Sequence, residues 1–101
     1  MKHILPIALT VAAFSVAAPA YAAGDAAAGK AKAASCAMCH GPNGEGTQMA
    51  PKLAGEDPAK FTQAMQDYAS GKRDNAMMKS QASNLSDADV ANLAAYYASL
   101  K

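Results

Sequence analysis

The chain has 101 residues, with nine Lys plus Arg against eight Asp plus Glu and a formal net charge of +1 at pH 7. A charge this close to zero argues against a polyanionic partner such as nucleic acid. The length allows one small domain, and a domain of this size usually needs a disulfide, a metal or another bound group for stability.

The first 22 residues have the pattern of a targeting segment. A short basic start at residues 1–3 precedes a nearly uncharged apolar run over 4–17, and Ala20-Tyr21-Ala22 supplies small residues for a signal peptidase. We expect a secretory signal peptide cleaved after Ala22, a mature domain of residues 23–101, and export to the periplasm. An uncleaved membrane anchor is the alternative, but the apolar run is short for a bilayer span of about 20 residues.

Without residues 1–22 the composition changes. Residues 23–101 carry eight Lys plus Arg and eight Asp plus Glu, so the mature domain is formally neutral. They keep only one valine, four leucines and one phenylalanine amid many alanines. A large, flat, apolar prosthetic group would supply the missing core volume, so the composition by itself predicts a bound cofactor.

The first half of the mature chain predicts a helix and then a loop. The helix covers residues 26–35 behind the N-cap Asp25. It contains Gly29, which either allows a close helix contact or is simply tolerated. Residues 41–55 contain four glycines and two prolines and show no apolar period, which predicts an irregular loop.

The second half predicts two further helices separated by a polar loop. One starts at Asp57-Pro58, ends near Ser70-Gly71 and carries an apolar stripe at helical spacing. A polar break over residues 72–75 follows, and Met77 and Met78 come after it in a loop that is expected to continue over residues 79–84. The stripe residues of the first of these helices are Phe61, Ala64, Met65 and Tyr68.

The last helix has the clearest start signal. Ser86 followed by Asp89 resembles a capping box, and Leu85 can pack against Val90 as a hydrophobic staple. Apolar residues recur at helical spacing almost to Lys101. No segment alternates with a period of two over a useful length, so the predicted fold class is all-α, in one domain.

The most specific motif is Cys36-Ala37-Met38-Cys39-His40. This spacing is the signature of covalent c-type haem attachment. Two cysteines at i and i+3 lie on one face of a helical turn, where both sulfurs can reach the two vinyl groups at one edge of a porphyrin. His40 can then bring an imidazole nitrogen to the iron. The motif predicts one covalently bound haem c with Cys36 and Cys39 in thioether bonds and His40 as an axial iron ligand.

Three other interpretations of Cys36 and Cys39 are weaker. A thioredoxin-like redox pair needs a strand–helix alternation that the sequence lacks. A zinc site needs two more ligands, but the mature chain has no other cysteine and only one histidine. A disulfide between these two residues would close a small, strained loop and contribute little stability.

The ligand on the second face of the iron decides the chemistry. An open face permits oxygen or peroxide reactions, whereas a methionine sulfur closes it and raises the reduction potential. Met38 lies inside the attachment motif, Met49 is near it, and Met65 belongs to an apolar helix stripe. Met77 and Met78 lie far enough along the chain to cover the opposite face, and spacing alone leaves these two nearly even.

The order of motifs over the whole mature chain resembles a small bacterial class I cytochrome c. The haem motif continues as Gly41-Pro42-Asn43-Gly44, and Pro51-Lys52-Leu53-Ala54-Gly55, Ser70-Gly71-Lys72-Arg73 and Leu85-Ser86-Asp87 follow in order. The pattern is most similar to a single domain of cytochrome c4 or to a monohaem cytochrome c553-type protein. Only one Cys-Xaa-Xaa-Cys-His occurs here, unlike in the two-haem members.

The resemblance implies a class I cytochrome c fold, with about four helices wrapped around one haem and the first and last helices crossing. It implies that the ligand methionine stands seven residues before the leucine of the Leu-Ser helix start, which is Met78, with Met77 as runner-up. It also implies that the Pro51 carbonyl accepts a hydrogen bond from the His40 ring.

The function expected from these features is that of a periplasmic monohaem electron carrier, not an enzyme. Its partners would be redox proteins such as a quinol-oxidising complex, a terminal oxidase or a reductase. No nucleic acid, no membrane span after cleavage, and a monomer or weak dimer are expected. One alternative is an electron-transfer subunit of a larger redox complex. Another is a haem protein that reacts with a gas or peroxide, although the mature chain has no second histidine for acid–base work.

Overall fold

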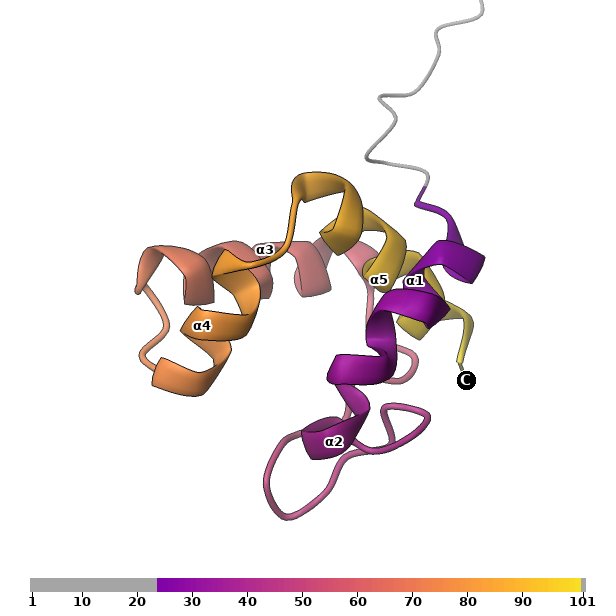
Figure 1. Cartoon of the computed structure of the whole chain (residues 1–101), viewed down its shortest axis with the longest axis horizontal. Helices are drawn as coiled ribbons and strands as arrows, with labels where there is room; N and C mark the ends of the chain where they lie inside the picture. The colour runs from indigo at the N-terminus through magenta and orange to yellow at the C-terminus, as the bar shows by residue number, and fades with distance from the viewer. Residues whose placement is uncertain (1–23, 101) are drawn as a thin grey trace, which may run out of the picture.

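The structure is a computed structural model, and it describes residues 24–100 (Figure 1). The expected signal peptide, residues 1–22, lies outside the described residues. Within 24–100 the regular elements are all helical, which confirms the predicted all-α class, and none of these helices is long and apolar enough to cross a membrane. The elements are α1 (Ala26–Lys32), the 3₁₀ turn η2 (Ala33–Ser35), α2 (Ala37–His40), α3 (Pro58–Ser70), α4 (Ala76–Ser83) and α5 (Asp87–Ser99).

The first predicted helix begins where expected but is not continuous. The Asp25 side chain accepts hydrogen bonds from the backbone of Ala27 and Ala28, at 2.9 and 3.4 Å, and so caps α1. The helix then tightens into η2, as α-helices often do at their C-terminal ends. The separate short helix α2 carries Cys39 and His40. Residues 26–35 therefore form an α-helix and a 3₁₀ turn rather than one uniform helix.

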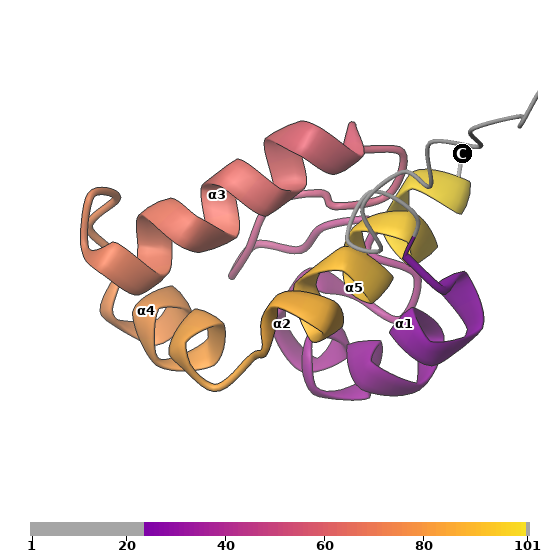
Figure 2. The ribbon, with the colours of Figure 1, turned by 90° about the horizontal axis from the view of Figure 1, so that it is seen from above.

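Helix α1 packs chiefly on α5, and the two run side by side in both views of the ribbon (Figures 1 and 2). Gly29 lies at their contact. A Cβ added to Gly29 would overlap the backbone carbonyl of Asn92 and come within 2.8 Å of the Tyr96 Cβ. Asn92 also accepts a hydrogen bond from the backbone N–H of Asp25, at 2.8 Å. Gly29 is therefore a close-packing site, which the sequence had left undecided.

Replacing Gly29 with alanine should destabilise the fold by about 1–3 kcal/mol, the usual cost of overpacking a close contact. Helix propensity alone predicts the opposite sign, a gain of up to about 1 kcal/mol. Denaturant unfolding of the two proteins measures the difference. Ala31→Gly, at an exposed position of α1, is the matched control and should cost no more than about 1 kcal/mol. A Gly29→Ala protein more stable than the wild type would show that the two helices do not touch here.

The start signals of α3 and α5 are confirmed. The Asp57 side chain accepts from the backbone of Lys60 at 3.1 Å, with Pro58 in the first turn. Ser86 and Asp89 form the reciprocal capping box, with both hydrogen bonds at 3.0 Å. The hydrogen bond from the Ser86 backbone holds the pKa of Asp89 below its usual range. Lys32 lies 3.5 Å from the same carboxylate and so links α1 to α5.

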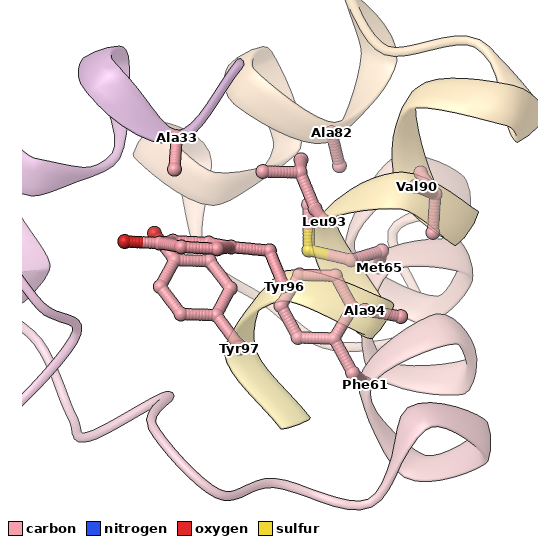
Figure 3. Packing of buried hydrophobic residues seen from close by; sticks show 9 residues of the cluster. All are labelled: Ala33, Phe61, Met65, Ala82, Val90, Leu93, Ala94, Tyr96 and Tyr97. Atoms are coloured by element: carbon pink, nitrogen blue, oxygen red, sulfur yellow. The ribbon is translucent and has the colours of Figure 1, made fainter. Parts of the chain in front are cut away.

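The buried core lies between α3 and α5 and is dominated by aromatic rings (Figure 3). The Tyr97 ring centroid is 5.8 Å from that of Phe61 and 5.1 Å from that of Tyr96. Tyr97 and Leu93 are the largest side chains with almost no exposed surface. The predicted stripes on α3 and α5 therefore supply this core, and Ala33 and Ala82 close it from α1–η2 and α4.

The segment around residues 76–83 corrects one prediction. The sequence predicts a loop over residues 76–84, but residues 76–83 form the helix α4, packed against α3. Its side chains have no apolar period because only Ala82 is fully buried, so periodicity could not reveal the helix. Asn75 caps the helix by accepting from the backbone N–H of Met78 at 3.0 Å. The sequence signal for the start of this helix is Asn75, a common N-cap residue, directly before Ala-Met-Met.

Candidate cofactor site

One cavity of about 430 Å³ brings together most of the residues that the sequence singled out. Its size lies within the roughly 300–1,000 Å³ that is usual for a cofactor pocket. The wall formed by η2, α2 and the following loop contributes Cys36, Cys39, His40 and Pro51. The wall formed by α3 and α4 contributes a different set, which includes both candidate methionines. Its members are Phe61, Ala64, Met65, Tyr68, Met77, Met78 and Gln81.

Cys36 and Cys39 stand on the same turn. The backbone N–H groups of Cys39 and His40 both donate to the Cys36 carbonyl, at 3.2 and 3.0 Å. Both thiols are partly buried, line the cavity and are not joined in a disulfide. Two sulfurs one helical turn apart on the same wall can reach two neighbouring points on one edge of a large ligand.

His40 is buried, with 6% of its surface exposed. Its Nδ1 lies 2.7 Å from the backbone oxygen of Pro51. Since a carbonyl oxygen can only accept, Nδ1 must carry the proton, which leaves Nε2 as the ring nitrogen that can bind a metal. This is the arrangement found for metal-binding histidines, whose second nitrogen is fixed by a hydrogen bond to a carbonyl or carboxylate. The geometry therefore suits His40 for binding a metal through Nε2.

The irregular loop holds Pro51 in reach of His40. The Gly44 carbonyl accepts from the backbone of Leu53 and Ala54 at 2.8 and 2.9 Å, which folds the loop back on itself. Gly44 has a φ of +65°, and a Cβ there would come within 2.6 Å of the Tyr97 ring. A larger residue at Gly44 would therefore push the loop, and Pro51 with it, away from the core.

The two candidate methionines differ in burial. Met77 is 69% exposed, whereas Met78 is partly buried and packs against the core. Both side chains line the cavity, but consecutive residues of an α-helix point about 100° apart, so the two do so to different depths. Burial therefore favours Met78 as the side chain that faces further inward.

The other methionines lie where the sequence predicted. Met38 and Met49 are among the most exposed large apolar side chains, and Met65 is buried in the core, where it also lines the cavity. Met49 lines the cavity from the loop after α2, whereas Met38 does not line it. These positions leave Met77 and Met78 as the candidates from the α4 wall.

The cavity lining is largely apolar, with three charged residues: Lys52, Glu56 and Arg73. Beneath it, burial raises the pKa of Tyr97 well above its usual value, and the neighbouring Cys36 adds to the shift. The phenol therefore stays neutral. Two thiols on one turn, an oriented imidazole and a thioether on another helix form a donor set that fits a large apolar ring with a central metal.

A second, larger hollow of about 810 Å³ lies along α3 and α5 near Gly24. Its described lining has no cysteine, histidine or methionine. Across residues 24–100, no three His, Cys, Asp or Glu side chains gather as a metal site. The chemistry therefore assigns the site to the smaller cavity.

Comparison with known proteins identifies the family to which the chain is related. Residues 22–96 match the family model described as cytochrome c oxidase, cbb3-type, subunit III. The chain is 49% identical over 73 residues to a cytochrome c4 from Pseudomonas aeruginosa, covering 71% of this chain and 36% of that protein. It is 41% identical over 103 residues to a "Thiosulfate dehydrogenase electron acceptor" of Thiomonas intermedia, covering all of this chain and 45% of that one.

A solved structure gives the same picture of the fold. The cytochrome c4 of Acidithiobacillus ferrooxidans superposes with a TM-score of 0.71 at 32% identity, over 74% of this chain and 49% of that chain. The present chain spans less than half the length of each of these three proteins.

Proposed function

Because the chain belongs to the class I c-type cytochromes and resembles a single cytochrome c4 domain, we propose that it is a one-electron carrier with one covalently bound haem c. Members of this family hold haem c, with its iron, through cysteine side chains. The observation that carries the proposal is a single cavity lined by Cys36, Cys39, His40 and Met78, in which Pro51 already orients the His40 ring.

Each residue has a distinct role in this proposal. Cys36 and Cys39 would hold the haem through two thioether bonds, and His40 Nε2 and Met78 Sδ would bind its iron. When bound, the haem iron supplies reversible one-electron chemistry between its ferrous and ferric states. The hydrogen bond to Pro51 keeps the His40 ring in one orientation in both states. A soft thioether from Met78 favours the ferrous form, and the apolar lining keeps water away.

We place this carrier in the periplasm, exported by the signal peptide expected at residues 1–22, as a monomer or weak dimer. Its partners would be redox proteins, such as a quinol-oxidising complex, a terminal oxidase or a reductase. The near-neutral charge supports a protein partner over nucleic acid. If His40 and Met78 both bind the iron, no open position would remain for a substrate, which favours a carrier over an enzyme.

A second candidate is an electron-accepting subunit of a larger redox complex. The match of the whole chain to 45% of the thiosulfate dehydrogenase electron acceptor of Thiomonas intermedia favours it. Co-purification from the native organism separates the two: a stable stoichiometric complex supports the subunit, and a free monomer supports the carrier.

Haem attachment is the first test. Protein from a host that matures c-type cytochromes, denatured and reduced in pyridine, should show the absorption of a c-type haemochrome, and its mass should include one haem. Alkylation should find no free thiol at Cys36 or Cys39. Cys36→Ala/Cys39→Ala, which cannot form thioethers, is the control and should lose the haem on denaturation. Two freely alkylated thiols in the matured wild-type protein would refute the proposal.

A further inference from the structure

Thr47 is an exposed residue of the loop between α2 and α3, but its hydroxyl is bonded to two backbone groups of the protein. Its Oγ1 donates to the backbone carbonyl of Cys39 and accepts from the backbone N–H of Met49, at 3.1 Å. The backbone N–H of Thr47 also donates to the Ala50 carbonyl, at 2.9 Å. Thr47 therefore joins the loop to α2 and closes the turn that residues 47–50 form.

This turn leads directly into Pro51, whose carbonyl orients the His40 ring. Pro51 has no backbone N–H, so it cannot donate a hydrogen bond that would hold it in place. The position of its carbonyl therefore depends on the chain on either side. After Pro51, the backbone is held by two hydrogen bonds to the Gly44 carbonyl. Before Pro51, it is held by the turn that Thr47 closes.

The loop also folds back beside α2 at Gly46 (Figure 1). The backbone N–H of Gly46 donates to the His40 carbonyl at 2.8 Å. Gly46 has a φ of +89°, and a Cβ there would come within 2.9 Å of the Lys52 nitrogen and 3.3 Å of the Pro51 carbonyl carbon. The two ends of the segment 46–51 therefore lie against each other, next to His40.

The hydrogen bonds around Thr47 connect Cys39 to the His40 ring through the loop. They run from the Cys39 carbonyl to the Thr47 hydroxyl, through the turn to Pro51, and from the Pro51 carbonyl to His40 Nδ1, at 2.7 Å. Apart from the His40 ring, Thr47 is the only member of this network that takes part through its side chain. It is therefore the member that a substitution can remove while the backbone groups stay.

We infer that Thr47 is a positioning residue for His40: its hydroxyl fixes the turn that holds the Pro51 carbonyl against the His40 ring. The inference rests on the proposed function, in which His40 binds the haem iron. Without the hydroxyl, the contacts of Gly44 and Gly46 remain. The Pro51 carbonyl should therefore become less firmly placed in a domain that still folds.

A less firmly placed carbonyl has two measurable consequences. The proton on His40 Nδ1 should exchange with solvent faster. The reduction potential should rise, because a firm hydrogen bond at the second nitrogen makes a metal-bound imidazole a stronger electron donor, which stabilises ferric iron. Loss of a direct partner of such a histidine costs about 10–100-fold in metal affinity or activity, and Thr47 acts one contact further away, so we expect the ferrous-to-ferric ratio at a fixed potential to rise about two- to tenfold.

The test uses the haem-loaded protein, with NMR of the His40 Nδ1 proton in the reduced state and a potentiometric titration. Thr47→Val removes the hydroxyl but keeps the branched shape. It should speed up proton exchange by about fivefold or more, the effect of losing one ordinary hydrogen bond, and raise the potential. Thr47→Ser keeps the hydroxyl and should restore the wild-type values of both.

Thr62→Val is the matched control. It makes the same substitution in α3, where the Thr62 hydroxyl donates to the Pro58 carbonyl at 2.9 Å and the residue does not line the cofactor cavity. Both the exchange rate and the potential should stay at their wild-type values. A shift in Thr62→Val as large as in Thr47→Val would show a general effect of removing a hydroxyl and overturn the inference.

Wild-type exchange and potential in Thr47→Val would also overturn it. So would faster exchange that a lower free energy of unfolding, measured with denaturant, fully accounts for, with the potential unchanged, because Thr47 would then be merely structural. If Thr47→Val does not mature, Thr47→Ala replaces it. If neither matures, Thr47→Ser decides: wild-type values support the role of the hydroxyl, and failure to mature refutes it. A wild type without a c-type haemochrome would instead contradict the proposed function.

Discussion

Replacing Met78 with alanine should lower the reduction potential of the haem-loaded protein and open its iron to added ligands. A methionine sulfur favours ferrous iron, so its loss stabilises the ferric state. The expected fall is on the order of 100 mV, well inside the span of about 0.8 V that axial ligands cover. Carbon monoxide should bind the reduced variant readily and the reduced wild type poorly. Potentiometry and absorption spectra measure both effects.

Met77→Ala is the matched control for this experiment. It removes the same side chain from the neighbouring position on α4, where Met77 is 69% exposed. Because neighbouring helix positions point about 100° apart, this variant should keep the wild-type potential and its resistance to carbon monoxide. If Met77→Ala opens the iron and Met78→Ala does not, the ligand is Met77. A wild type that binds carbon monoxide as readily as Met78→Ala would instead favour a gas-reactive protein.

The protein without haem should be largely unfolded. The cavity of about 430 Å³ would be left without its contents. At about 24 cal/mol per Å³, an unfilled space of this size costs up to roughly 10 kcal/mol. Water entering the open cavity reduces that cost, but a small domain has only about 5–15 kcal/mol of stability in total. The described core cannot compensate, since Leu93 and Tyr97 are its largest side chains with almost no exposed surface.

Circular dichroism of haem-free Cys36→Ala/Cys39→Ala protein tests this expectation against the matured wild type. The far-ultraviolet signal should show little helix, and heating should produce no cooperative transition. Wild-type apoprotein, expressed without the maturation machinery and kept reduced, should behave in the same way, which separates loss of haem from the substitutions themselves. A cooperative thermal transition in either haem-free sample would show that the chain folds around its own side chains.

The sequence correctly predicts those structural features, such as helix caps, in which a residue interacts with its near neighbours in the chain. The N-caps Asp25 and Asp57 and the box of Ser86 with Asp89 are all present in the structure. Phe61 and Met65 of the predicted α3 stripe also belong to the core, with Tyr68 packed against it, as do Val90, Leu93, Ala94 and Tyr97 of α5. Caps and stripes depend on residues at most a few positions apart, so a single sequence contains all the information they need.

Helix α4 and the break after α1 were missed for a related reason. Helix α4 buries one small residue, Ala82, so its sequence has no apolar period to detect. The change from α1 to η2 at Ala33 has no marker in the run of alanine and lysine before Cys36. Both features depend on how these segments pack against α3 and α5 rather than on their own composition.

By itself, the sequence determined the fold class and the kind of site, because a Cys-Xaa-Xaa-Cys-His motif and a core poor in aliphatic residues are local and compositional facts. The tertiary structure decided matters that depend on residues far apart in the chain. It showed Gly29 against Asn92, the Pro51 carbonyl 2.7 Å from His40, Met78 rather than Met77 against the core, and the Thr47 hydroxyl on the Cys39 carbonyl. Spacing cannot reveal such contacts, since each depends on the direction of a side chain after the helices have packed.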